Sequence, residues 1–153
     1  MSDRDFVLEL DFAVPAERLY AQFATEGGIH HWWTTACMIE NKVGGTAQFH
    51  FAEDGFTPLM KITKLQPGHI VEWKVINARH PDKFAYKNPH DWEGHLIRFE
   101  IQAVDPANSR LKFTHEGLMG VESGEFCSKA WRHFLGLSLR EYFETGKGRP
   151  AGG

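Results

Sequence analysis

One long amphipathic helix near the C-terminal end constrains the fold more than any other feature of the sequence. Apolar and small residues recur there at steps of three and four, at Ala130, Trp131, Phe134, Leu135, Ser138, Leu139 and Tyr142. Ser123 suits the N-cap position of this helix, and Gly146 suits its C-terminal end. A helix with one wide apolar face has to bury that face against another layer of secondary structure.

Most of the preceding chain alternates apolar and polar residues, which is typical of β-strands. The first run places four apolar residues on one side, at Phe6, Leu8, Leu10 and Phe12. Two short helices follow, one beginning near Pro15 and one over residues 25–31 with Thr25 as its N-cap. Further strands follow, and their inward side carries Phe49, Phe51, Met60, Ile62, Val71, Trp73, Val75, Ile97, Phe99, Ile101, Leu111 and Phe113. The sequence therefore predicts an α+β fold, a curved antiparallel sheet wrapped around the long C-terminal helix.

The composition favours one globular domain that is unusually rich in aromatic rings. Phe, Trp and Tyr make up 13% of the 153 residues, which requires a thick core or a wide apolar cavity. The net charge of −3 leaves no basic excess for nucleic acid or for an anionic membrane surface. Two cysteines without a C-x-x-C spacing, together with an N-terminus that lacks a signal pattern, lead us to expect a cytoplasmic protein.

Four short stretches carry a resemblance to a known family: "VPAERLYAQFAT", "IHHWW", "GGTAQFHF" and the ending "WRHFLGLSLREYFETGKG". With them the sequence resembles the START-like (SRPBCC) superfamily, and within it the group related to the C-terminal domain of the activator of heat-shock protein 90 ATPase. The resemblance implies a helix-grip fold, with a cavity between helix and sheet that holds an apolar small molecule. We expect a START-like domain over residues 1–146 and a flexible tail over residues 147–153.

We expect twelve residues to line that cavity: Trp32, Trp33, Phe49, Phe51, Met60, Trp73, Phe99, Phe113, His115, Trp131, Phe134 and Leu135. For each residue taken alone, a place in the packed core is the better interpretation. The neighbours Trp32 and Trp33 follow the second short helix. We predict that one of the two rings is buried and that the other is partly exposed at the cavity mouth. The loop over residues 77–91 lacks any period, so a lid is one interpretation of it.

The polar residues of the sequence do not form a recognisable catalytic, cofactor or metal-binding set. His95 and His115 share the inward side of their strands. If Ile101 pairs with Phe113, the two histidines lie about 13 Å apart at ~3.3 Å per residue, which is too far for one ion. For His115, a hydrogen bond to the head of a bound ligand is the alternative to a structural role.

The remaining polar candidates are weaker. His80, His90 and Asp91 lie in the long loop, where we interpret them as solvated polar residues. The adjacent His30 and His31 diverge on a helix and are not a chelating pair. Cys127 begins the long helix, where a lowered thiol pKa is conceivable, although a small buried residue is the usual outcome.

Three functions remain open from the sequence. The leading hypothesis is that the domain binds a small apolar or aromatic molecule, such as a lipid-like or hydrophobic metabolite. The first alternative is a co-chaperone-like interaction module, by analogy with the heat-shock protein 90 activator. The second is an enzyme, a hydrolase or cyclase, that uses a cavity histidine. The expected partners are a small hydrophobic molecule or a chaperone, and a monomer and a homodimer both remain open.

Overall fold

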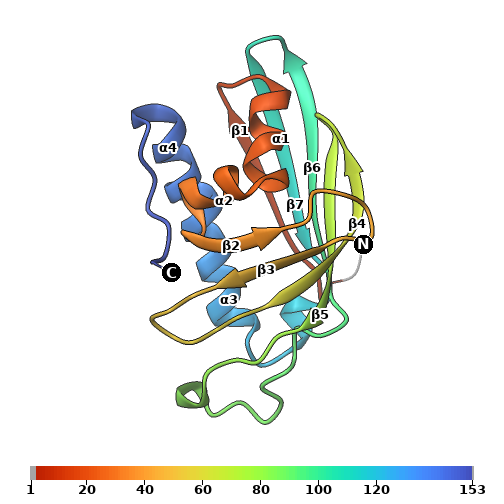
Figure 1. Ribbon diagram of the computed structural model, residues 1–153, viewed down its shortest axis with the longest axis vertical. Coiled ribbons are helices and arrows are strands. Elements are labelled where there is room, and N and C mark those ends of the chain that lie inside the picture. Colours follow the sequence, from red (N-terminus) through yellow and green to blue (C-terminus); the bar gives the residue numbers. More distant parts are fainter. Residues whose placement is uncertain (1–2, 153) are drawn as a thin grey trace.

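The computed structural model describes residues 3–152 and has the predicted α+β architecture. Seven antiparallel strands form one curled sheet in the order β1-β7-β6-β5-β4-β3-β2. A C-terminal helix of 22 residues, blue in Figure 1, runs along this sheet, and the two short helices lie near its upper half. No helix within the described residues is both long enough and apolar enough to cross a membrane.

The elements follow the chain in the order that the sequence predicts. The strands are β1 (Phe6–Phe12), β2 (Ala36–Ile39), β3 (Thr46–His50), β4 (Leu59–Gln66), β5 (Ile70–Asn77), β6 (Leu96–Asp105) and β7 (Asn108–His115). The short helices are α1 (Ala16–Ala24) and α2 (Glu26–Trp32), with short 3-10 turns at η1 (Asp82–Phe84) and η2 (Leu118–Gly120). The long helix consists of α3 (Gly124–Trp131), the π-helical η3 (Arg132–Ser138) and α4 (Leu139–Thr145).

The second short helix begins where its cap predicts. The side chain of Thr25 accepts a hydrogen bond of 2.9 Å from the backbone N–H of Gly28. Gly28 also lets α2 pack closely on α1, because a Cβ atom there would lie 2.0 Å from the backbone oxygen of Ala21. A glycine that weakens the helix by propensity is therefore required by packing.

The hairpin formed by β6 and β7 has a register that differs from the predicted one. Ile101 pairs with Leu111, whereas the sequence suggested Phe113 as its partner. The five residues "DPANS" do not form an open loop, because Asp105 already pairs with Asn108 and the chain turns within two residues. The Asp105 carboxylate accepts a hydrogen bond from the backbone N–H of Ala107, which stabilises this tight turn.

Both tryptophans after α2 are buried, so the prediction that one of them is partly exposed is wrong. Trp32 is 0% and Trp33 3% exposed, and their rings stack at 5.7 Å between centroids. Trp33 is the C-cap of α2, with φ −108° and ψ −66°. The Trp32 indole donates a hydrogen bond to the backbone oxygen of Gln22, while Trp33 stacks on Trp131 at 5.0 Å.

The C-terminal segment, which the sequence suggests is a flexible tail, runs back along the domain as far as it is described. The backbone N–H of Ala151 donates to the oxygen of Trp33, and the N–H of Thr35 donates to the oxygen of Ala151. The backbone N–H of Arg149 donates to the hydroxyl of Ser138 at 2.7 Å. Gly153, the last residue of the predicted tail, lies outside the described residues, as do Met1 and Ser2.

The two neighbouring glycines of α2 provide a matched test of this packing. We expect Gly28→Ala to lower the free energy of unfolding by about 3 kcal/mol or more, because the added methyl group collides with backbone. A methyl group at Gly27 would meet no other segment of the chain within 4 Å, so Gly27→Ala should be neutral or stabilise by up to about 1 kcal/mol. Urea unfolding followed by circular dichroism measures both, and equal effects would contradict the close packing of α2 on α1.

Candidate functional site

A partly open cavity of about 230 Å³ lies at one end of the domain, beside the first half of the long helix. Its walls come from α3, from the start of η3, from the segment after β3, from the loop between β5 and β6, and from Ala151. Aromatic side chains predominate in the lining, at Trp33, Phe51, Phe56, His80, Phe84, Trp92, Phe126, Trp131 and Phe134. Such an apolar wall with few polar groups is typical of a site for a small organic molecule.

The structure brings four of the twelve predicted cavity residues to this cavity: Trp33, Phe51, Trp131 and Phe134. The other eight are packed elsewhere in the interior and do not line it, namely Trp32, Phe49, Met60, Trp73, Phe99, Phe113, His115 and Leu135. Their rings fill the space between helix and sheet; Phe99, for example, stacks on Phe23 at 4.2 Å and meets Trp73 at 4.9 Å. The cavity therefore lies at the end of this packed interior.

Sequence reasoning missed the lining residues that come from loops. Phe56 follows β3, Phe84 lies in η1, and Trp92 lies between η1 and β6. The alternation of inward and outward residues along a strand could not identify them, because these segments do not alternate. The signal available was composition: three aromatic residues and two histidines lie between residues 80 and 92, which is unusual for a solvated loop.

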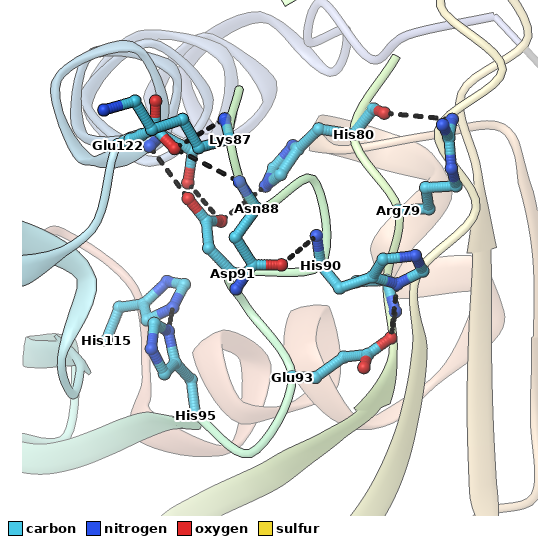
Figure 2. A network of polar contacts seen from close by, with 12 residues as sticks. Arg79, His80, Lys87, Asn88, His90, Asp91, Glu93, His95, His115 and Glu122 are labelled. Atoms are coloured by element: carbon cyan, nitrogen blue, oxygen red, sulfur yellow. Dashed lines mark hydrogen bonds and ion pairs between the residues drawn. The ribbon is translucent and has the colours of Figure 1, made fainter. Parts of the chain in front are cut away.

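The long loop is fixed to the start of the long helix through the buried carboxylate of Asp91 (Figure 2). Asp91 accepts hydrogen bonds from the backbone N–H of Ser123 at 3.0 Å and from its hydroxyl at 2.8 Å. It also contacts Nε2 of His80 at 3.0 Å. Ser123 thus precedes the helix as predicted, but its side chain bonds Asp91 and does not cap the helix itself.

The interpretation of His80 and Asp91 as solvated loop residues is wrong, since they are only 4% and 7% exposed. Burial lowers the pKa of His80 below its ordinary value of 6.5, although the Asp91 carboxylate opposes that shift. The neutral ring therefore donates its Nε2–H to Asp91 and stacks on Phe56 at 4.9 Å. His90 remains half-exposed and contacts Glu93, so it differs from His80.

A second polar chain joins the sheet to the long helix behind the cavity. The Trp131 indole N–H donates to Nδ1 of His115 at 3.1 Å, so His115 carries its proton on Nε2. That Nε2–H donates to Nδ1 of His95 at 3.0 Å (Figure 2). Burial lowers the pKa of both histidines, and that of His115 lies well below 6.5. Both rings are accordingly neutral.

The predicted separation of about 13 Å between His95 and His115 is therefore wrong. The corrected hairpin register places His115 opposite Ile97, which brings it two positions closer to His95 along the sheet. His115 has both ring nitrogens engaged by Trp131 and His95, which leaves none for a ligand or an ion. Among the described residues, no group of three or more His, Cys, Asp or Glu side chains is placed to hold a metal.

Cys127 lines the cavity but has the character of a small buried side chain. Burial raises the pKa of its thiol to about 12, although contacts with Ser123 and Trp92 favour the thiolate. The alternative of a reactive cysteine with a lowered pKa is therefore wrong. The charged residues of the lining are two acids, Glu53 and Asp54, and Asp54 forms an ion pair with Lys83.

The fold and this aromatic cavity together define a helix-grip domain of the START-like class. The chain belongs to the family described as Activator of Hsp90 ATPase homolog 1-like protein, whose family model matches residues 13–144. A search of curated proteins found no match.

Solved structures share the fold across nearly the whole chain. An Aha1 dimer from Colwellia psychrerythraea is 28% identical, with a TM-score of 0.76 over 94% of this chain and 98% of that one. A protein from Staphylococcus saprophyticus is 16% identical, with a TM-score of 0.72 over 97% and 98%. A Plasmodium falciparum protein described as an HSP90 activator is 18% identical, with a TM-score of 0.63 over 86% and 91%.

Removing the Asp91 carboxylate should loosen the wall of the cavity. We expect Asp91→Ala to lower the free energy of unfolding by about 3 kcal/mol, because two donors of Ser123 and one of His80 lose a buried acceptor. Asp82→Ala is the matched control, since this exposed acid of the same loop pairs with Arg79 at the surface and should cost at most about 1 kcal/mol. Urea unfolding at pH 7.5 compares the two, and similar losses would contradict the anchoring role.

The neutral histidines predict that acid destabilises the fold. Below pH 6.5 the unfolded chain binds protons more readily than His80, His95 and His115 do in the fold, so the free energy of unfolding falls as the pH falls. Each contributes a slope of up to about 1.4 kcal/mol per pH unit. We expect His115→Phe to have a lower free energy of unfolding at pH 7.5, because Trp131 loses its hydrogen-bond acceptor. Between about pH 6.5 and 5.5, its free energy of unfolding should fall less steeply with pH than that of the wild type. Parallel slopes in urea titrations would contradict a neutral His115.

Proposed function

We propose that the protein binds a small apolar or aromatic molecule in the cavity between Trp33, Trp92 and Trp131. The observation that carries the proposal is the lining itself, in which aromatic rings from separate segments of the chain converge on one partly open space. At about 230 Å³ the cavity is smaller than most drug-sized sites, which measure roughly 300–1,000 Å³. A single ring system or a short chain suits it better than a long-chain lipid.

The surroundings of the cavity support a site that persists without its ligand. One wall is the long helix, and the facing wall is the loop that Asp91 fixes to the start of that helix. Glu122 adds two further hydrogen bonds, which it accepts from the backbone N–H groups of Lys87 and Asn88. A preformed wall lowers the ordering cost of binding.

Filling the cavity with a side chain tests this proposal. Ala130 lines the cavity from α3, and we expect Ala130→Phe to occupy the space and weaken binding of ethylbenzene at least tenfold. Ala107→Phe makes the same change at the exposed turn between β6 and β7 and should leave binding unaltered. Calorimetry and ligand-induced thermal stabilisation measure the affinity, since a ligand that prefers the folded state raises the melting temperature. Wild-type protein that binds no ethylbenzene at its solubility limit would contradict the proposal.

An enzyme that uses a cavity histidine receives no support from this geometry. His115 is fully buried, does not line the cavity, and uses both ring nitrogens in structural hydrogen bonds. His80 does line the cavity, but its Nε2–H is bound to Asp91 and burial keeps the Cys127 thiol of the same lining protonated, so this set does not define a reaction.

A second candidate function is interaction with a chaperone of the heat-shock protein 90 type. It is favoured by the family to which the chain belongs and by the Plasmodium falciparum neighbour described as an HSP90 activator. Stimulation of the ATPase of the cognate chaperone tests it, and an unchanged rate at high protein excess would remove it. The Colwellia neighbour is described as a dimer, so a homodimer is the corresponding proposal for assembly, measured by light scattering.

A further inference from the structure

The Trp92 indole nitrogen is the one buried side-chain nitrogen or oxygen within residues 3–152 without an oxygen or nitrogen partner, and its side-chain contact is with the Cys127 sulfur. The residue is 3% exposed and its side chain lines the cavity. Buried indole N–H groups nearly always have an acceptor, because an unsatisfied donor costs about 1–3 kcal/mol. The protein supplies this donor only with the Cys127 sulfur, a weak acceptor, and with no oxygen or nitrogen atom.

The Trp92 ring is held in place, so it cannot turn freely to find an acceptor elsewhere. Phe56 meets it edge-on at 5.2 Å, and His115 meets it edge-on at 4.8 Å. Trp131 lies nearly parallel to it at 6.1 Å, with an angle of 13° between the planes. These neighbours fix the direction of the N–H as well as the position of the ring.

The neighbouring groups are poor or occupied acceptors. The sulfur of Cys127 lies beside Trp92, but a protonated thiol is a weak acceptor and burial keeps this thiol protonated. Asp91 already accepts from Ser123 and His80. A carbonyl oxygen or ring nitrogen of a bound molecule would be a better acceptor for Trp92 than any of these.

The charges at the cavity restrict the ligand further. Glu53 and Asp54 are the acids of the lining, and Lys83 balances Asp54. Glu53 has no ion pair among the described residues, so the lining keeps an excess of negative charge. Glu53 is exposed at the rim of the cavity, and its charge repels a carboxylate ligand there, although solvent weakens the repulsion. The apolar rings of the wall disfavour a charged ligand as well, because they cannot replace its water.

We propose that the ligand is a small uncharged aromatic molecule with one hydrogen-bond acceptor, such as an aromatic carbonyl compound, and that Trp92 Nε1–H binds this acceptor. The inference rests on the proposed function, because it specifies the molecule that the cavity takes. Trp92 acts as the specificity-determining residue, the surrounding rings bind the aromatic part, and the apolar wall with the Glu53 charge at its rim disfavours the corresponding acids.

Three probes of similar size separate these contributions. Ethylbenzene has the ring without an acceptor, acetophenone adds a neutral carbonyl oxygen, and benzoate replaces the methyl group with a charged oxygen. Trp92→Phe keeps an aromatic ring and removes the N–H. The measured quantity is the affinity for acetophenone divided by the affinity for ethylbenzene, determined for the wild-type protein and for Trp92→Phe. The smaller ring of the variant weakens both probes alike, and the cost of desolvating the carbonyl is the same in both proteins. Both effects therefore cancel when the two quotients are compared.

We expect the quotient to fall about tenfold from wild type to Trp92→Phe, as for a buried hydrogen bond of about 1.4 kcal/mol. A change of less than twofold overturns the inference and indicates that ordered water satisfies Trp92. If neither ethylbenzene nor acetophenone binds the wild-type protein, the proposed function itself fails. If ethylbenzene binds and the quotient is unchanged, only the acceptor inference fails.

A measurement on the wild-type protein keeps the test independent of how well Trp92→Phe folds. In ¹H–¹⁵N spectra we expect acetophenone to move the Trp92 indole proton downfield relative to its position with ethylbenzene. Equal positions with the two probes would overturn the proposal.

The weaker binding of carboxylate ligands is tested separately. We expect benzoate to bind wild-type protein at least tenfold more weakly than acetophenone does, and Glu53→Gln to narrow that difference. A benzoate affinity equal to that of acetophenone in the wild type would contradict the exclusion of carboxylates.

Discussion

The packing of Trp131 against the sheet is the interaction on which the rest of the structure depends. Its ring lies 4.5 Å from Phe113 of the sheet and 5.0 Å from Trp33 after α2, and its N–H donates to His115. One side chain of the long helix therefore joins the helix to the sheet, to the end of α2 and to the hydrogen-bonded pair of His115 and His95. The same residue forms part of the cavity wall, so the core and the candidate site share one set of contacts.

This arrangement explains why the cavity lies at one end of the domain. Between helix and sheet, large rings such as Phe99 and Trp73 pack on each other and leave the middle filled. Beyond Trp131 the sheet no longer supplies rings, and loops provide the facing wall. A loop can serve as a wall only if it is fixed, and the buried Asp91 fixes this one to the backbone of Ser123.

Periodic segments were predictable from the sequence, and the aperiodic ones were not. Alternation identified the strands, and steps of three and four identified the long helix, since both reflect burial of one face. The hairpin register depended on the tight turn at Asp105 and Asn108, which composition alone could not distinguish from an open five-residue loop. That error separated His95 from His115, which are hydrogen-bonded in the fold. Trp92 and His80 were missed as cavity-lining residues because loops have no regular alternation of buried and exposed positions. The high content of aromatic rings in this loop was nevertheless a signal of burial.

The most direct test of ligand binding at Trp92 is a crystal structure of the protein soaked with acetophenone. We predict electron density for one ring between Trp33, Trp92 and Trp131, with the carbonyl oxygen within hydrogen-bond distance of the Trp92 indole nitrogen. Density for the probe only at another surface, or a cavity closed by the protein's own side chains, would contradict this prediction.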